Sequence, residues 1–335
     1  MTSPSRAPLT LLACQPAVPL SERVAAHLGE TLRPLQETWF ACGEGKAVLP
    51  ENVRGTDVYI IQSAIGPGDP HSVYDRFVML LHAVEAAALA DADHITAVLP
   101  YYPGARQDKR KGRTREGIAA GLFARCLEAA GAQRVITLEI HNSAIGGMFD
   151  PRRCSLENVL LEPSLSSWLL SQGIEADVVV SPDVGGLERA RAYAQTLNLD
   201  LAMLSKVRDT TRANHIVNAT LIGDVQDKNV LLIDDIVDTA GSVVTAVRRL
   251  WEGGAKDVTI SCAHALLSDP APERLERLHQ DALQRGTRVR LISSTSIERH
   301  DLPVWHQQFD LAPLLARVIR SVNTRGSVTG AQAGS

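Results

Sequence analysis

Short apolar runs alternate with stretches of helical periodicity along most of this chain. A strand buried on both faces of a parallel sheet reads as a continuous apolar run, whereas an amphipathic helix repeats its apolar residues about every three or four positions. The continuous runs predict strands at 58–62, 95–99, 135–140, 178–180, 230–233 and 258–262. The periodic stretches predict helices at 76–90, 118–130, 187–197 and 242–251. This alternation predicts an α/β fold with mostly parallel sheets flanked by helices.

The length of 335 residues exceeds what one hydrophobic core usually serves, so we predict two domains. The polar segment that begins at Asp150, broken by a proline and preceded by a glycine-rich turn, is expected to join them. The predicted domains cover 8–152 and 153–322. The remaining residues, 323–335, are rich in small and polar side chains and are expected to be disordered.

Composition narrows the function classes. The formal net charge of −4 argues against a general nucleic-acid binder or an anionic-membrane binder. No apolar stretch is long enough to span a bilayer, and the first residues lack the pattern of a signal peptide. The five cysteines are scattered and odd in number, which is typical of reduced thiols rather than a disulfide or zinc framework. We therefore expect a cytoplasmic protein without a nucleic-acid or membrane partner.

The run 230–242, VLLIDDIVDTAGS, carries the most specific chemistry. Its apolar start predicts a buried strand, and two carboxylates, Asp234 and Asp235, follow at the strand's carboxyl end. The small and hydroxyl-bearing residues after them open a predicted helix, whose free N–H groups and macrodipole favour an anion. Carboxylates accept hydrogen bonds from vicinal sugar hydroxyls and help to hold a metal ion. The run therefore predicts a site for a sugar phosphate.

This run resembles the signature with which phosphoribosyltransferases and ribose-phosphate diphosphokinases (phosphoribosyl diphosphate synthases) hold ribose 5-phosphate. The resemblance implies two similar phosphoribosyltransferase-like domains. It also implies a set of ribose 5-phosphate ligands in the second domain: Asp234, Asp235, Asp238, Thr239, Ala240, Gly241 and Ser242. The run alone does not distinguish an enzyme that makes an activated ribose from one that uses it.

A second run, 100–116, reads PYYPGARQDKRKGRTRE and places six cationic side chains within 106–115. A solvated basic loop is the ordinary interpretation of such a run. Here the loop follows a predicted strand, where α/β proteins bind ligands, and Arg and Lys side chains suit a polyphosphate. The pair Tyr101-Tyr102 with Arg106-Gln107-Asp108 resembles the nucleotide-binding segment of ribose-phosphate diphosphokinases, which phosphoribosyltransferases lack. The resemblance implies ATP contacts from Arg106 and Gln107, and from Phe40 and Glu44 of a neighbouring subunit.

Three further segments match this family. His141 ends a predicted strand, and the resemblance makes it a ligand, with Asp183, of the Mg²⁺ that accompanies ATP. The segment 181–186, SPDVGG, resembles the loop that faces the diphosphate, through Asp183, Gly185 and Gly186. Lys206 and Arg208 correspond to the catalytic cations of a mobile loop that closes over the triphosphate. Together these residues imply transfer of the diphosphoryl group of MgATP to the anomeric hydroxyl of ribose 5-phosphate, which yields phosphoribosyl diphosphate and AMP.

The sequence departs from the family pattern on the nucleotide side. The family's Phe-Ser-Asp-Gly-Glu segment is here 40–44, FACGE, so that Cys42 replaces a hydrogen-bond acceptor. Two alternatives therefore stay open: a catalytically weak homologue that regulates a true synthase, and a phosphoribosyltransferase. A nucleotide site completed by Phe40 and Glu44 of a neighbour predicts a homo-oligomer based on dimers, up to a hexamer. The sequence does not define the diphosphoryl donor or the effectors.

Overall fold

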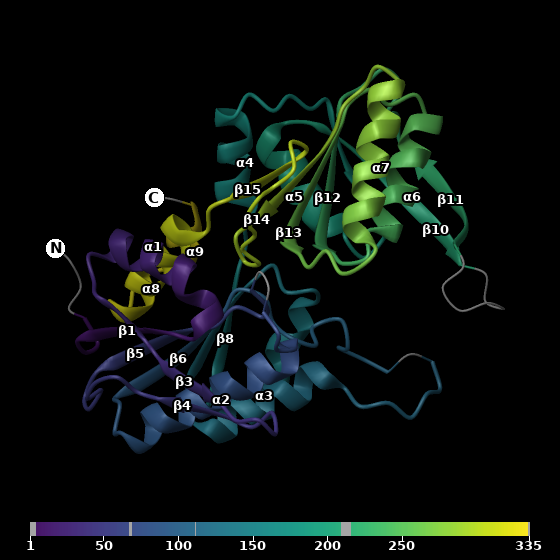
Figure 1. Ribbon diagram of the computed structural model, residues 1–335. Helices are drawn as coiled ribbons and strands as arrows, with labels where there is room; N and C mark the ends of the chain where they lie inside the picture. Colours follow the sequence, from purple (N-terminus) through teal and green to yellow (C-terminus); the bar gives the residue numbers. More distant parts are fainter. Residues whose placement is uncertain (1–4, 67–68, 111, 209–215, 334–335) are drawn as a thin grey trace. The chain divides into compact units, whose positions relative to one another are not determined.

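The computed structural model describes residues 5–66, 69–110, 112–208 and 216–333 (Figure 1). The chain forms two compact units. The first contains 1–161, 296–299 and 310–335, and the second contains 162–295 and 300–309. Both are α/β, which confirms the predicted fold class. Within the described ranges, no helix is both long and apolar enough to cross a membrane.

The first unit is built on a six-stranded sheet in which every pairing is parallel. The strand order is β2 (Leu32–Pro34), β1 (Leu9–Ala13), β5 (Asp57–Ile61), β6 (His94–Leu99), β7 (Arg134–Leu138) and β8 (Ser155–Val159). An antiparallel hairpin, β3 (Gln36–Trp39) and β4 (Gly45–Val48), stands apart from this sheet.

The helices of the first unit cover the two faces of its sheet. Helices α2 (Val73–Leu89) and α3 (Ala119–Ala130) share one hydrophobic core with side chains of β1, β5 and β6, such as Leu12, Val58 and Ala97. Helix α1 (Val18–Leu28) packs with α8 (Ala312–Asn323), and the short α9 (Val328–Ala333) packs on α8. Short 3-10 segments occupy Gln15–Ala17 and Ser143–Met148.

The second unit carries a seven-stranded sheet. Its order is β11 (Ile216–Ile222), β10 (Asp200–Arg208), β9 (Val178–Ser181), β12 (Val230–Val237), β13 (Val258–Ala265), β14 (Val289–Ser294) and β15 (His306–Phe309). Only the β10–β11 pairing is antiparallel. The helices are α4 (Glu162–Ser171), α5 (Leu187–Leu197), α6 (Gly241–Glu252) and α7 (Ala271–Gln284). Helices α6 and α7 lie side by side and share the main core with β9, β12 and β13.

Every predicted strand and helix is present, with ends that differ by a few residues, and three expectations need correction. Strand β12 continues to Val237, so Asp234 and Asp235 lie within the strand rather than after it. The first unit extends through 161 and takes in the C-terminal helices, whereas 152 was the expected boundary. The tail is not disordered throughout, because α9 forms there. Its Gln332 accepts a hydrogen bond from the Leu160 amide, and Arg317 donates to the carbonyl of Ala331.

Candidate functional site

The turn from β12 into α6, which we call the ribose loop (residues 238–242), has the backbone of an anion site. Strand β12 lies between β9 and β13 in the middle of its sheet, so the loop leaves from the sheet's carboxyl edge. Ala240 adopts a left-handed conformation with φ of 58° and precedes α6 without any side-chain cap on the helix. The first N–H groups of α6 are therefore available to an oxyanion.

One basic side chain outside the sequence motif supports this loop. Arg274 of α7 donates from Nη1 to the carbonyl oxygen of Thr239 over 2.9 Å. A Cβ atom at Gly241 would lie 3.4 Å from that same nitrogen, which leaves the guanidinium just enough room beside the loop. Arg274 thus fixes the loop's backbone and adds positive charge at the place where a phosphate is expected.

The two carboxylates of β12 are held by the backbone that follows them. Asp234 accepts a hydrogen bond from the Asp235 amide, and Asp235 accepts one from the Ile236 amide, each over 2.9 Å. Asp235 is buried, and its carboxylate lies 3.9 Å from Nη2 of Arg189 on α5. Burial, followed by the charge of Asp235 and then that of Asp183, raises the pKa of Asp234 well above its usual range.

Three carboxyl groups, those of Asp183, Asp234 and Asp235, thus lie where β9 and β12 end. Carboxylate oxygens are the ligands that Mg²⁺ prefers, and a bound cation would relieve the repulsion between Asp234 and Asp235. Asp183, Asp234 and Asp235 therefore have the ligand chemistry that suits a magnesium ion. Across the described residues, however, no group of three or more His, Cys, Asp or Glu side chains is arranged so that it could hold a metal ion. The expected ligand His141 belongs to the other unit.

The segment after β9, which we call the diphosphate loop (residues 181–186), turns tightly around Asp183. The Asp183 carboxylate accepts a hydrogen bond from the Gly186 amide over 3.1 Å, and the Ser181 hydroxyl donates to the Asp183 carbonyl over 2.7 Å. A Cβ at Gly186 would approach the Ser181 hydroxyl to 3.0 Å, so glycine is needed for this close packing. Gly185 and Gly186 lead directly into α5, which places the loop at a helix N-terminus.

Lys206 and Arg208 occupy the end of β10. In the antiparallel pairing Lys206 lies opposite Ala219 and Arg208 opposite Ile216. Both backbones thus belong to a strand, although the sequence suggested a loop. Their side chains lie outside the described residues, as does the segment 209–215 that joins β10 to β11.

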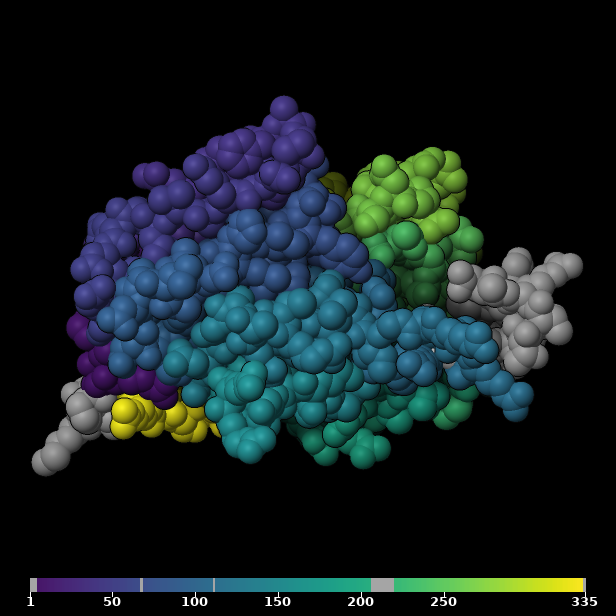
Figure 2. All heavy atoms as spheres, turned by 90° about the horizontal axis from the view of Figure 1, so that it is seen from below, coloured from purple at the N-terminus to yellow at the C-terminus, as the bar shows by residue number. Residues whose placement is uncertain are grey.

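In the first unit, the basic segment extends from the carboxyl end of β6 as a long arm whose described residues are 106–110 and 112–117 (Figures 1 and 2). Arg106 and Gln107 are exposed at its base, where the Gln107 amide nitrogen lies 3.5 Å from the Tyr74 hydroxyl. Beneath them, buried Tyr102 donates to the carbonyl of Ala120 over 3.0 Å. The base of the arm is therefore anchored to α2 and α3, while the cationic side chains among its described residues are exposed.

Asp108 connects the basic arm to the segment that carries His141. Asn142 donates a short hydrogen bond to the Asp108 carboxylate, and its own side-chain oxygen accepts from the Ala144 amide over 3.0 Å. Burial by itself raises the pKa of Asp108, but Asn142, Lys109 and the neighbouring His141 outweigh it and hold the pKa below its usual value. The exposed His141 thus lies at the same sheet edge as Arg106 and Gln107.

Phe40, Cys42 and Glu44 form the turn between β3 and β4. The turn is closed by hydrogen bonds from the Phe40 amide to the Glu44 carbonyl over 2.8 Å and from Gly43 to Phe40 over 2.9 Å. All three side chains are exposed, and Phe40 retains 48% of its accessible surface. A ring presented in this way at a hairpin tip is suited to stack on a flat partner.

The hairpin is fixed by a buried network that the sequence pattern did not reveal. Arg76 forms a bidentate pair with Asp69, with both distances 2.6 Å, and donates to Glu37 of β3 over 2.8 Å. Its guanidinium also lies 5.5 Å from the ring of Trp39, which stacks on His71 at 3.7 Å. Arg76 lies at the start of a predicted amphipathic helix, where a solvated side chain is the ordinary expectation, so only the structure reveals its role.

The two units therefore carry different chemistry: the first has a cationic segment after β6, and the second has a helix N-terminus beside buried carboxyl groups. Folds and loops of this kind define a protein built from two phosphoribosyltransferase-type units. A family model for the N-terminal domain of ribose phosphate pyrophosphokinase matches residues 9–131, and one for the phosphoribosyl transferase domain matches 163–312.

Known proteins are similar to this chain in sequence and in structure over nearly its whole length. Ribose-phosphate pyrophosphokinase of Bacillus subtilis is 38% identical over 310 residues, 92% of each chain, and that of Corynebacterium ammoniagenes is 38% identical over 311 residues, again 92% of each. The crystal structure of phosphoribosylpyrophosphate synthetase from Mycobacterium smegmatis superposes with a TM-score of 0.83 at 33% identity and covers 95% of this chain and all of that one. The chain belongs to the ribose-phosphate pyrophosphokinase family, which confirms the resemblance found in the sequence.

Proposed function

We propose that this protein transfers the diphosphoryl group of MgATP to the anomeric hydroxyl of ribose 5-phosphate, forming phosphoribosyl diphosphate and AMP. The observation that carries the proposal is the presence, in one chain of this family, of both the ribose loop at 238–242 and the nucleotide-type segment at 106–108. A phosphoribosyltransferase would need only the first of these.

On the acceptor side, the ribose phosphate would bind the N-terminus of α6 through backbone N–H groups and the hydroxyls of Thr239 and Ser242. Asp234 and Asp235 would accept hydrogen bonds from the ribose hydroxyls, with Asp238 beside them. Arg274 would hold Thr239 in place and contribute positive charge. This arrangement leaves the anomeric hydroxyl unoccupied and free to react.

On the donor side, Arg106 and Gln107 would bind the nucleotide, and Phe40 and Glu44 of a neighbouring subunit would contact the adenine. The protein would therefore act as a homo-oligomer. Asp183 and His141 would ligate Mg²⁺, which withdraws charge from the phosphate oxygens. The diphosphate loop, with Gly185 and Gly186, would accept the transferred group at the N-terminus of α5.

The anomeric oxygen attacks the β-phosphorus, the bond from that phosphorus to the α-phosphate oxygen breaks, and the electron pair leaves on AMP. Lys206 and Arg208 would neutralise the charge that develops on the transferred and leaving oxygens. Phosphoryl chemistry of this type depends on in-line positioning and charge stabilisation more than on covalent catalysis. The proton of the anomeric hydroxyl passes to solvent or to a phosphate oxygen, because no described side chain is placed as its base.

The test is direct. The purified protein is incubated with MgATP and ribose 5-phosphate, and AMP and phosphoribosyl diphosphate are measured together. We expect equal amounts of the two products. Binding of ribose 5-phosphate without AMP formation would instead support a regulatory homologue, which the loss of an acceptor at Cys42 makes the main alternative. Consumption of phosphoribosyl diphosphate with a free base would identify a phosphoribosyltransferase.

A further inference from the structure

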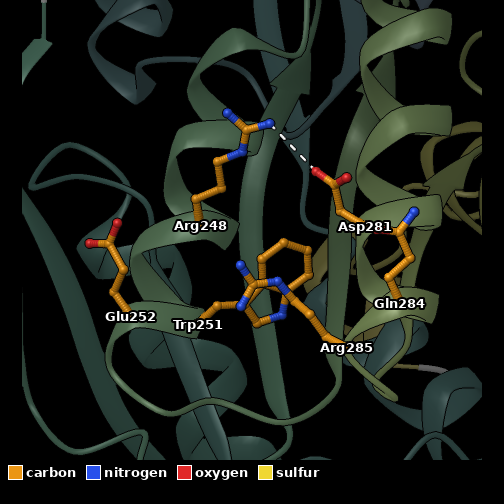
Figure 3. A pocket seen from close by; sticks show the side chains of 6 residues that line it. All are labelled: Arg248, Trp251, Glu252, Asp281, Gln284 and Arg285. Atoms are coloured by element: carbon orange, nitrogen blue, oxygen red, sulfur yellow. Dashed lines mark ion pairs between the residues drawn. The ribbon is translucent and has the colours of Figure 1, made fainter.

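A pocket of about 550 Å³ lies between α6 and α7, at the ends of these helices opposite to the ribose loop (Figure 3). Its lining consists of Arg248, Trp251, Glu252, Asp281, Gln284 and Arg285. None of these residues belongs to the predicted substrate sites. The pocket lies wholly within the second unit.

One arginine of the lining, Arg285, has no carboxylate partner in the described part of the chain, because the two carboxylates of the lining pair with other arginines. Arg248 lies 3.5 Å from the carboxylate of Asp281, and Glu252 lies 2.6 Å from Arg249, so each carboxylate of the pocket already has a basic neighbour. Among the described residues, no carboxylate lies within ion-pair distance of Arg285. Its guanidinium instead lies 4.8 Å from the centre of the Trp251 ring. An exposed guanidinium on an aromatic face keeps its N–H edge free for an oxyanion.

Trp251 supplies a second, independent observation. Its ring is nine-tenths buried, yet its indole N–H has no hydrogen-bond partner among the described residues. Buried polar groups are ordinarily satisfied, and an unsatisfied donor costs free energy. The indole nitrogen itself has almost no accessible surface, so the donors that the pocket exposes come from Arg285 and the Gln284 amide, and Trp251 contributes the aromatic face on which Arg285 lies.

The two helices that form the pocket also hold the ribose loop. Helix α6 begins at Gly241 of that loop, and α7 supports it through the bond from Arg274 to Thr239. Asp281 follows Arg274 by two helical turns and Arg285 by three, so the pocket lies about 10–16 Å along α7 from Arg274. A ligand that bridges α6 and α7 at one end therefore favours the helix spacing that the Arg274 bond requires at the other.

We propose that this pocket binds a small organic oxyanion, a carboxylate or phosphate ester, and that its occupancy raises the affinity of the ribose loop for ribose 5-phosphate. Binding at the pocket stands independently of the catalytic assignment. The coupling rests on the proposed function, because it requires the loop to bind ribose 5-phosphate. Coupling of this kind is reciprocal, so ribose 5-phosphate must raise the affinity of the pocket by the same factor.

The first experiment measures binding by calorimetry with citrate, which offers only carboxylates, and with glycerol 3-phosphate, which offers only a phosphate. The protein is the full chain, without ribose 5-phosphate. We expect Arg285→Ala to weaken binding of the preferred probe roughly tenfold, the order expected for loss of one charged hydrogen bond. Trp251→Phe should weaken it too and remove the accompanying change in tryptophan fluorescence. Arg277→Ala is the matched control, because Arg277 is an exposed α7 side chain paired with Glu273 outside the pocket.

The results of two experiments decide the proposal. Equal affinity in wild type, Arg285→Ala and Trp251→Phe would place the probe elsewhere and overturn it, as would the absence of binding by both probes. The second experiment titrates ribose 5-phosphate with and without the bound probe, where we expect about a fivefold tighter affinity that Arg274→Ala abolishes. Binding at Arg285 without any change in ribose 5-phosphate affinity would refute the coupling. Failure of ribose 5-phosphate to bind at all would refute the proposed function and leave the first experiment intact.

Discussion

The close packing of the diphosphate loop can be tested by adding a single methyl group. In Gly186→Ala, the new Cβ would lie 3.0 Å from the Ser181 hydroxyl, closer than real Cβ contacts normally come. Ser181 is fully buried, and its hydroxyl already donates to the Asp183 carbonyl over 2.7 Å. It therefore has to move and to weaken that bond. We expect a loss of about 1–3 kcal/mol in the free energy of unfolding, the usual cost of overpacking, and a higher KM for MgATP.

A double-mutant cycle separates this collision from a general effect of alanine. Ser181→Ala alone removes one buried hydrogen bond and should cost about 1 kcal/mol. In the double variant Ser181→Ala/Gly186→Ala the colliding oxygen is absent, so the total should be near that of Ser181→Ala, which gives a coupling as large as the loss in Gly186→Ala, about 1–3 kcal/mol. Urea denaturation of the four proteins measures each term. Additive losses would refute the argument that Gly186 is required by its contact with Ser181.

Three further outcomes follow from the same geometry. Lys206→Ala should lower kcat by about two to three orders of magnitude while calorimetry shows little change in ribose 5-phosphate affinity; equal loss of both would exclude the proposed role. Arg274→Met should raise the Kd for ribose 5-phosphate about fivefold with KM for MgATP unchanged, because the support of Thr239 and one positive charge at the ribose loop are lost. Burial raises the pKa of Asp57, but His94, Asn323 and a tyrosine outweigh it, so the folded pKa lies below the unfolded one. Its stabilisation is therefore present above the unfolded pKa and lost as pH falls through the folded pKa. Asp57→Asn should flatten the acid side of the stability profile in urea denaturation, and an unchanged acid limb would contradict this.

The sequence pattern predicted the elements that consist of buried, continuous apolar runs. It missed the elements that depend on a few long-range hydrogen bonds. Strand β5 is buried throughout, is apolar after Asp57, and was predicted within one residue. The hairpin β3–β4 alternates exposed and half-buried positions and depends on Arg76 reaching Glu37 across 39 residues, so no local signal marks it. Helix α9 has the composition of a disordered tail, yet Gln332 bonds to a residue 172 positions away. Long-range hydrogen bonds of this kind leave no trace in periodicity.

The candidate site was predictable from the sequence where all of its groups lie in one continuous segment of the chain. The ribose loop and the diphosphate loop each lie within one strand, turn and helix, so their backbone N–H groups could be located from the sequence. Arg274 of α7 and Arg189 of α5 reach Thr239 and Asp235 from outside the strand, turn and helix of the ribose loop and were missed for that reason. Their presence alters the electrostatics of the site, because Arg274 adds positive charge at the ribose loop and Arg189 lies beside Asp235.

The distribution of charge explains why neither motif alone identifies the reaction. The first unit gathers cations at the carboxyl end of β6, and the second gathers carboxylates where β9 and β12 end. Burial and then the charges of Asp235 and Asp183 raise the pKa of Asp234, and the same cluster of carboxylates would repel a triphosphate. A polyanionic donor can therefore approach these carboxylates only together with a cation, and a hard divalent ion suits both the carboxylates and the phosphate oxygens. The acidic unit thus favours a ligand that carries a metal ion, and the basic unit favours a polyphosphate, which is why we propose MgATP as the donor.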